Sequence, residues 1–284
     1  MEELSGPRPA KNGKVPVSGA GPTEPVGVWT RATDVCYRVL VARARDLTLS
    51  TGGRSALVLA PHPDDETFGC AATILRKRAA GAQVSIFVVS DGGAFNVEEM
   101  SRDELVAARE DNVREATRRL GVPSDDLHLL GYPDLKLREL VDSMTSRFAA
   151  IFKELDPDEI YIPSSIDFHP DHVAVHTASL RAVERSVSHA SLYTYPVWFW
   201  SRKSWSVSGE STLRRKLLLS RVFVAAIRGL RPVKVRTEGH LETKRELMDI
   251  YGLELEPDYD FFEKWHLRDE ELFFATSTHT RGRT

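Results

Sequence analysis

The chain has 284 residues, of which 42% are hydrophobic and 28% are charged, and its formal net charge at pH 7 is -3. This composition is typical of a globular protein, and the small net charge argues against a nucleic-acid partner. The two cysteines, Cys36 and Cys70, have neither a metal-binding nor a redox spacing, so a reducing compartment fits better than a disulfide scaffold.

The first 27 residues are rich in glycine, proline and other small residues and contain no apolar core segment. We therefore expect residues 1–27 to be a disordered leader and not a signal peptide. No apolar run in the sequence reaches the roughly 18 residues needed to span a bilayer. We expect a cytoplasmic protein with a single domain at residues 28–276 and a loose tail at residues 277–284.

From Trp29 onward, helical and strand patterns alternate along the chain. Apolar residues at helical spacing predict helices at 29–49, 67–80, 102–120, 137–155, 173–185 and 241–251. Short apolar or aromatic runs predict strands at 55–60, 84–90, 127–130, 159–162 and 191–195. Strands that alternate with helices indicate an α/β fold with a mostly parallel sheet and right-handed crossovers.

The stretch at about 196–236 breaks this alternation, and we interpret it as an aromatic and basic insertion or lid. Its residues Trp198 and Trp200 could stack on the apolar face of a sugar or could pack in the core, since tryptophan buries a large area in any setting. The basic residues of 214–236 could contact a membrane surface or a phosphate-bearing substrate, or could form a solvated helix face. Beyond it, we expect the aromatic segment 257–274 to be irregular.

Two runs of charged residues stand where predicted strands end. Pro61-His62-Pro63-Asp64-Asp65-Glu66 follows the first strand, and His169-Pro170-Asp171-His172 lies in the same kind of strand-to-helix turn far downstream. The carboxyl ends of the strands are where open α/β sheets bind ligands. Carboxylates crowded there would repel one another unless a cation or protons compensated them. Together the two runs predict one divalent-metal hydrolase site built from two loops.

Each run has a plainer explanation when it is taken alone. A single histidine in a turn is usually a hydrogen-bonded surface residue, and acidic residues at a helix start interact favourably with the helix dipole. The repetition of His-Pro-Asp at two strand ends makes the metal site the stronger interpretation.

The residue types suggest how such a site would work. Zinc binds histidine nitrogen and carboxylate oxygen, and a catalytic zinc site has three protein ligands and an open position. His62 and Asp65 can converge around the tight turn, and His172 can complete the set. His176, four residues later on the same predicted helix, is a competing third ligand. Asp64, next to the ligands, is the candidate general base.

Other residues of the same segments have supporting roles. His169 could face the substrate carbonyl and stabilise its oxyanion, and Asp171 could hold His169 protonated and oriented. Glu66 is expected to accept hydrogen bonds from the loop backbone. Arg109 and Glu110 could form a helix ion pair or could brace the site.

The two charged runs together resemble the signature of the LmbE-like or PIG-L family of zinc-dependent N-deacetylases. The resemblance spans roughly residues 55–251 and leaves out the leader, the insertion and the C-terminal segment. Its further segments are Ser90-Asp91-Gly92, Arg109-Glu110, Leu130-Gly131-Tyr132-Pro133-Asp134 and Lys244–Tyr251.

This resemblance implies a Rossmann-like three-layer sandwich with the active site at the carboxyl ends of the strands. It also implies one zinc ion per chain, although another divalent metal such as Fe²⁺ could occupy the same ligands. The implied zinc ligands are His62, Asp65 and His172. Asp64 would be the catalytic acid and base, and His169 would stabilise the tetrahedral intermediate.

The substrates that the resemblance implies are N-acetylglucosaminyl groups on small glycosides, lipid-linked glycans or natural-product precursors. Asp134 matches a family aspartate near the sugar, whereas Phe168 stands where some members have a tyrosine.

The main alternative is a family amidase acting on a larger N-acyl or thiol-conjugate substrate. A binding module with a vestigial metal site is a second alternative. A nucleotide-binding oxidoreductase is disfavoured, because no Gly-x-Gly-x-x-Gly follows Leu59 or Val89. The oligomeric state stays open.

Overall fold

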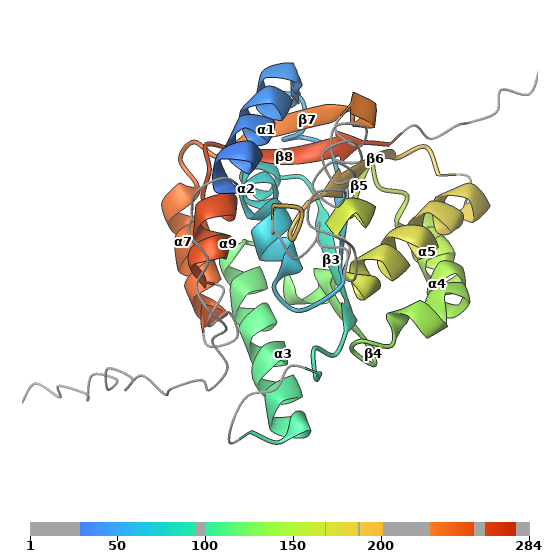
Figure 1. The fold of residues 1–284 in the computed structure, drawn as a ribbon. Coiled ribbons are helices and arrows are strands. Elements are labelled where there is room, and N and C mark those ends of the chain that lie inside the picture. The colour runs from blue at the N-terminus through green and yellow to red at the C-terminus, as the bar shows by residue number, and fades with distance from the viewer. Residues whose placement is uncertain are drawn as a thin grey trace, which may run out of the picture.

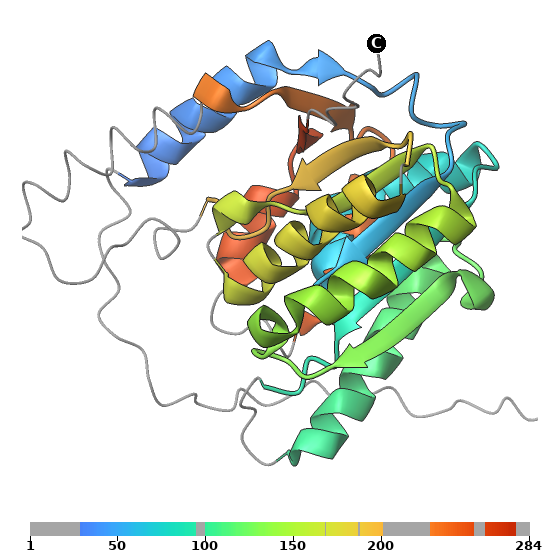
Figure 2. The same cartoon turned by 90° about the vertical axis from the view of Figure 1, so that its right-hand side faces the viewer.

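The computed structural model describes residues 29–94, 100–167, 169–186, 188–200, 228–252 and 259–276. Within these residues, an eight-stranded sheet lies between two layers of helices (Figures 1 and 2). The strands are β1 (Arg45–Asp46), β2 (Ala56–Ala60), β3 (Val84–Ser90), β4 (Leu127–Tyr132), β5 (Glu159–Pro163), β6 (Ser191–Tyr195), β7 (Pro232–Arg236) and β8 (Glu270–Ala275). The helices are α1 (Trp29–Arg43), α2 (Asp65–Ala79), α3 (Arg102–Arg119), α4 (Val141–Leu155), α5 (Pro170–Ser186), α7 (Leu241–Ile250) and α9 (Tyr259–His266), with short 3-10 turns η1 (Ser124–Asp126), η2 (Leu137–Leu140) and η3 (Ser165–Asp167).

The sheet has the strand order β1-β7-β8-β6-β5-β2-β3-β4. Among the strands that the structure describes, only the pairs β6–β8 and β7–β8 are antiparallel, so the predicted α/β fold with a mostly parallel sheet is confirmed. From β2 the chain proceeds to β3 and β4 on one side and later returns to β5 and β6 on the other. The carboxyl ends of β2 and β5 therefore lie side by side where the strand order reverses, which is the ligand-binding position of open α/β sheets.

Both faces of the sheet are covered by helices, which explains the unbroken apolar run of β2. Leu57 and Leu59 belong to the core under α4 and α5. Val58 and Ala60 belong to the core formed with α2, α3 and α7 on the opposite face. Figure 1 shows these two groups of helices on either side of the sheet. Because strand side chains alternate between faces, a strand in the middle layer must be apolar at every position.

The helices that carry the site begin earlier than expected. α2 begins at Asp65 instead of residue 67, and α5 begins at Pro170 instead of residue 173. Proline suits a first helical position, because its missing N–H would have no partner inside the helix there. As a result, Asp65 and His172 both lie in the first turn of a helix.

Other expected boundaries were wrong where pairing with distant residues determines the structure. α1 ends at Arg43 instead of residue 49, because Arg45 and Asp46 pair with β7. β4 continues to Tyr132, and the helix expected at 137–155 begins as the 3-10 turn η2.

The C-terminal segment was predicted to be irregular, and this prediction was wrong. It forms α9 and β8, and β8 joins β6 to β7 in the sheet. Strand β7 itself lies within the expected insertion at 196–236, so the end of that stretch is part of the sheet. Residues 201–227, the leader and the tail lie outside the described residues. No described helix is both long enough and apolar enough to cross a bilayer.

Gly69 of α2 packs so closely on Tyr195 that a side chain does not fit between them. A Cβ atom at residue 69 would lie 2.3 Å from Tyr195 Cδ2. We expect Gly69→Ala to lower the free energy of unfolding by about 1–3 kcal/mol, because overpacking a rigid core forces side chains off their rotamers. Urea denaturation measures this change.

Gly53→Ala is the matched control, because a Cβ atom there would meet nothing within 4 Å. It should change the free energy of unfolding by less than about 0.5 kcal/mol. Equal effects of the two substitutions would contradict the close contact with Tyr195.

Candidate metal centre and active site

The turn between β2 and α2 presents three consecutive carboxylates, Asp64, Asp65 and Glu66. Asp64 precedes the helix, and its carbonyl oxygen accepts hydrogen bonds from Thr67 N at 2.9 Å and Phe68 N at 3.0 Å. The φ of Asp64 is 151°, which residues other than glycine rarely adopt. Such a backbone persists only where the surrounding contacts hold it, and it is frequent at functional sites.

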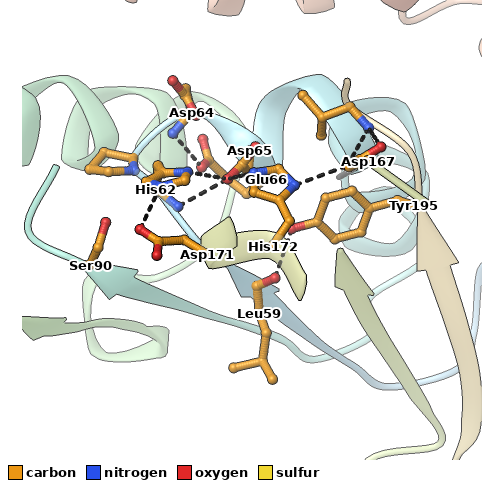
Figure 3. Close-up of polar contacts among 12 residues, drawn as sticks. Leu59, His62, Asp64, Asp65, Glu66, Ser90, Asp167, Asp171, His172 and Tyr195 are labelled. Carbon is orange, nitrogen blue, oxygen red and sulfur yellow. Dashed lines mark hydrogen bonds and ion pairs between the residues drawn. The ribbon is translucent and has the colours of Figure 1, made fainter. Parts of the chain in front are cut away.

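Asp65 lies between two imidazoles, one from each predicted loop (Figure 3). Its Oδ2 is 3.2 Å from His62 Nδ1 and 3.3 Å from His172 Nε2. The same oxygen accepts a hydrogen bond from the backbone N–H of His62 at 3.0 Å. The structure thus brings together the three side chains that the sequence suggested as ligands.

A second carboxylate orients His172. Asp167 Oδ2 lies 2.9 Å from His172 Nδ1, and the Asp167 carboxylate also accepts hydrogen bonds from the backbone N–H groups of Val197 and Phe199. With Nδ1 engaged, the buried His172 Nε2 faces Asp65 Oδ2 at 3.3 Å without the geometry of a hydrogen bond. A buried ring nitrogen in this condition suits a metal ion, and a carboxylate behind a metal-binding imidazole is the usual support.

Charge compensation within the cluster shifts the pKa values of its members. Burial alone would lower the pKa of His172, but the charge of Asp65 and the contact with Asp167 raise it to about 9. Burial would raise the pKa of Asp65, yet the His172 charge holds it well below its usual value. For His62, burial opposes the charged form, while neighbouring carboxylates, Asp134 first, raise the pKa well above its usual value. A divalent cation would supply the same positive charge and would bind the imidazoles in their neutral form.

His169 packs against the two other imidazoles. Its ring centroid is 4.9 Å from that of His62 and 5.1 Å from that of His172. Burial, followed by the charges of His172 and His62, lowers the pKa of His169 to about 3. Its Nδ1 is buried and has no hydrogen-bond partner. These surroundings disfavour the protonated imidazole that we expected for His169.

Asp171 faces His62 and does not pair with His169, so that expectation was wrong. Asp171 Oδ2 accepts a hydrogen bond from Leu135 N at 2.8 Å and lies 3.5 Å from His62 Nε2. Residues two positions apart at a helix start do not share a face, which keeps Asp171 away from His169. Asp134 reaches the same nitrogen of His62, at 3.3 Å from Oδ1.

Arg109 and Glu66 hold Asp64 in place. The buried Arg109 guanidinium donates from Nη2 to Asp64 Oδ2 at 3.0 Å and also bonds the backbone carbonyls of two adjoining loops. Glu66 Oε2 accepts a hydrogen bond from Asp64 N at 3.1 Å. Of the two interpretations of Arg109, the structure favours the brace, while Glu110 pairs with Arg114 on the surface at 3.8 Å.

The competing ligand His176 points elsewhere. Its Nδ1 lies 3.0 Å from the carbonyl oxygen of Pro163, and burial lowers its pKa. This geometry favours His172 over His176 as the third ligand.

The two tryptophans suggested for sugar binding are engaged in aromatic packing. Trp200 is 3% exposed and stacks on Trp265, with ring centroids 5.0 Å apart. Trp198 stacks on Phe261 at 6.0 Å. These contacts favour the core-packing alternative for both side chains.

Two groups of side chains within the described ranges place their ligand atoms within 4.8 Å of one another. These groups are His62, His169 and His172, and His62, Asp134 and Asp171. Asp65 Oδ2, with an imidazole nitrogen on either side, is placed to join the first group. Imidazole nitrogen and carboxylate oxygen suit zinc and iron, so the residues present fit a divalent ion.

Comparison with known proteins identifies the family. Residues 57–183 match the family described as PIG-L, GlcNAc-PI de-N-acetylase. A probable N-acetyl-alpha-D-glucosaminyl L-malate deacetylase 2 of Bacillus cereus is 30% identical over 203 residues, which cover 66% of this chain and 86% of that protein. The chain belongs to the PIG-L family, also called LmbE-like. It is accordingly an enzyme of the deacetylase type, which hydrolyses an amide C–N bond.

Two further proteins resemble the chain, one in sequence and one in fold. The 1D-myo-inositol 2-acetamido-2-deoxy-alpha-D-glucopyranoside deacetylase of Rhodococcus jostii is 28% identical over 187 residues, covering 56% of this chain and 63% of that protein. The solved structure of an N,N'-diacetylchitobiose deacetylase from Pyrococcus horikoshii superposes with a TM-score of 0.56 at 20% identity, covering 89% of this chain and 95% of that one. At this identity the superposition shows a shared fold.

We expect His172→Ala to lose most metal binding, whereas His176→Ala should keep it. His172 Nε2 faces Asp65, while His176 is bonded to a backbone carbonyl of β5. Removing one of three ligands should lower the affinity for zinc at least about 100-fold. Substitution of a residue that only supports a ligand already lowers metal affinity by about 10–100-fold, and loss of the ligand itself should cost at least as much. Competition with a chromogenic chelator measures it. Retained affinity in His172→Ala, or an equal loss in both variants, would refute the ligand assignment.

Proposed function

We propose that the protein is a divalent-metal-dependent deacetylase that removes the acetyl group from an N-acetylglucosaminyl-type sugar carried by a small partner molecule. The observation that supports it most strongly is the buried carboxylate of Asp65 flanked by His62 and His172. The named activities of the Bacillus and Rhodococcus relatives, both deacetylases of glucosaminyl compounds, support this substrate class. Zinc is the expected ion, with Fe²⁺ as the alternative.

His62, Asp65 and His172 would hold the ion. A divalent ion at these ligands would polarise the amide carbonyl and lower the pKa of water toward about 7. Asp167 behind His172 would keep the imidazole nitrogen directed at the ion, through the contact of 2.9 Å at Nδ1.

Asp64 would take the proton of the attacking water and later donate it to the departing amine. Its carboxylate is oriented by Arg109 at 3.0 Å, and its backbone N–H is held by Glu66 at 3.1 Å. The Asp64 carboxylate is thus held in position before a substrate arrives, and orienting a catalytic group in advance lowers the barrier to the reaction.

His169 would donate a hydrogen bond to the oxyanion that forms from the amide carbonyl. A neutral imidazole still carries one N–H, and the His169 ring is fixed by packing on His62 and His172. A donor already in place costs no reorganisation when the charge develops. Acetate and a free amino sugar would leave the site.

The sugar contact of Asp134 stays a prediction. Asp134 Oδ1 accepts a hydrogen bond from Leu135 N at 2.8 Å, and Oδ2 accepts one from Ala94 N at 3.1 Å. A sugar hydroxyl would therefore share an oxygen that is already bonded and held rigidly. Such an arrangement favours selection among hydroxyl positions over tight binding.

The purified protein, loaded with zinc or with Fe²⁺, should release acetate from at least one N-acetylglucosaminide in a panel of free, nucleotide-linked, lipid-linked and small-aglycone sugars. Free amine and acetate are both quantified, since release of a larger acyl acid instead would identify an amidase of the same family. Absence of hydrolysis across the panel with either metal would overturn the proposal.

Asp64→Asn should lower kcat by about 10²–10⁴-fold, the usual contribution of a general acid–base group, while zinc content stays unchanged. Asp142→Asn is the control, because Asp142 also pairs with an arginine, Arg181, at 3.0 Å, but on the surface of α4 and α5. Steady-state kinetics and elemental analysis on both variants test the role. Asp64→Asn with the activity of Asp142→Asn would rule it out.

A further inference from the structure

Helix α2 carries Asp65 in its first turn and is held from one side by buried polar groups of the C-terminal part of the chain. These groups come from α7, α9 and β8, which lie beyond the residues 57–183 that match the family. Figure 1 shows α7 and α9 on the same side of the sheet as α2. Within the described residues, these groups form hydrogen bonds with Glu66 and with the backbone of α2 and not with the predicted ligands.

The first of these contacts leads to the general base. The hydroxyl of Tyr251, just after α7, donates to Glu66 Oε1 at 2.7 Å. The other oxygen of Glu66 accepts the hydrogen bond from Asp64 N at 3.1 Å. Both Tyr251 and Glu66 are completely buried. One chain of hydrogen bonds therefore runs from α7 to the strained backbone of Asp64.

The second contact is a buried ion pair set against one turn of α2. Lys244 Nζ of α7 donates to Glu271 Oε1 of β8 at 2.7 Å and to the carbonyl oxygen of Phe68 at 2.9 Å. Glu271 accepts hydrogen bonds from Ala72 N at 2.9 Å and Thr73 N at 2.8 Å. Phe68 O and Ala72 N are the acceptor and donor of one helical turn, four residues apart. The ion pair thus bonds both ends of that turn.

The space next to this ion pair is too small to bind a substrate. A cavity of about 20 Å³ is lined by Lys244, Glu271 and His266, among others. That volume holds about one water molecule. His266 Nδ1 of α9 lies 3.1 Å from Phe68 O, the carbonyl oxygen that Lys244 of α7 also bonds.

We propose that Tyr251 and the Lys244–Glu271 pair are positioning residues, which fix the first two turns of α2 and thereby the placement of Asp64 and Asp65. This inference rests on the proposed function. A buried ion pair is weak evidence of stability, because similar-sized neutral residues often replace one without loss. The Lys244–Glu271 pair instead fixes the position of the turn of α2 from Phe68 to Ala72, which lies close to Asp64 and Asp65.

Tyr251→Phe removes one hydroxyl and keeps the ring. We expect kcat to fall about 10–100-fold with KM within about twofold, because small displacements of a catalytic group have effects of this size. Metal affinity should change less than about threefold, since this hydrogen-bond chain ends on Asp64 and not on a ligand. Hydrogen–deuterium exchange of residues 62–75 should rise.

Tyr161→Phe is the matched control. Tyr161 is also buried and also donates to a buried glutamate, Glu159 Oε2 at 2.8 Å, but at the amino end of the sheet. It should lose comparable thermal stability while kcat stays within about twofold and exchange of 62–75 stays unchanged. Equal kcat losses in the two variants, or an unchanged kcat in Tyr251→Phe, would overturn the positioning role of Tyr251.

The ion pair has its own matched control in Lys77–Glu159, which is equally buried and has the same N–O distance of 2.7 Å. The double variant Lys244→Met with Glu271→Gln should weaken zinc binding about tenfold and raise exchange of 62–75. Lys77→Met with Glu159→Gln should do neither at a comparable loss of thermal stability. Equal effects of the two double variants would show a merely structural role and overturn the inference for the pair.

Measurements of zinc affinity and hydrogen exchange need no substrate. They can therefore test the positioning of α2 independently of the proposed deacetylase activity. A wild-type chain that hydrolyses nothing in the sugar panel removes the proposed function. Raised exchange of residues 62–75 confined to the Tyr251 and Lys244–Glu271 variants, with weaker zinc binding in the Lys244–Glu271 variant, would still support the positioning of α2. Absence of those changes in an active enzyme would overturn the positioning alone.

Discussion

A carboxylate buried between two imidazoles sets the requirements that the remaining structure meets. Asp65 is 1% exposed, and an unpaired charge at such a position would be very costly. Its two partners, His62 and His172, come from loops more than a hundred residues apart in sequence. They meet because β2 and β5 are adjacent parallel strands whose carboxyl ends share one edge of the sheet. The strand order therefore brings together the imidazoles that compensate the charge of Asp65.

The supporting carboxylates around this centre share a mode of action, since each fixes backbone as well as a side chain. Asp167 holds His172 and also the N–H groups that follow β6. Glu271 pairs with Lys244 and also holds N–H groups of α2. Hydrogen bonds of ionised groups are stronger than neutral ones, so a few such carboxylates can fix several segments at once. The site is consequently rigid through its polar contacts as well as through its apolar core.

The convergence of His62, Asp65 and His172 could be predicted from the sequence, because strand ends of a parallel sheet meet and the residue types at those ends were visible. Glu66 and Arg109 were also indicated as supports, but the contributions of Asp167, Tyr251 and Glu271 could not be predicted. Tyr251 and Glu66 are 185 positions apart, and Glu271 lies on a strand with no clear local pattern. That strand forms because β6 and β7 provide partners on both sides, and pairing of this kind overrides local preference. Sequence patterns thus indicated the candidate reacting groups but only part of what positions them.

The run Asp64-Asp65-Glu66 shows how three consecutive carboxylates can each contact separate partners. Asp65 and Glu66 begin the helix, where successive side chains point about 100° apart because there are about 3.6 residues per turn, and Asp64 precedes the helix with a φ of 151°. The three side chains therefore reach three separate sets of partners: Arg109 for Asp64, imidazoles for Asp65, and the hydroxyls of Thr67 and Tyr251 for Glu66. In the proposed function, Asp64 beside Arg109 would transfer the proton and Asp65 between the imidazoles would hold the cation, while Glu66 accepts the backbone N–H of Asp64. The proposed roles of the three carboxylates therefore differ because each side chain contacts different partners.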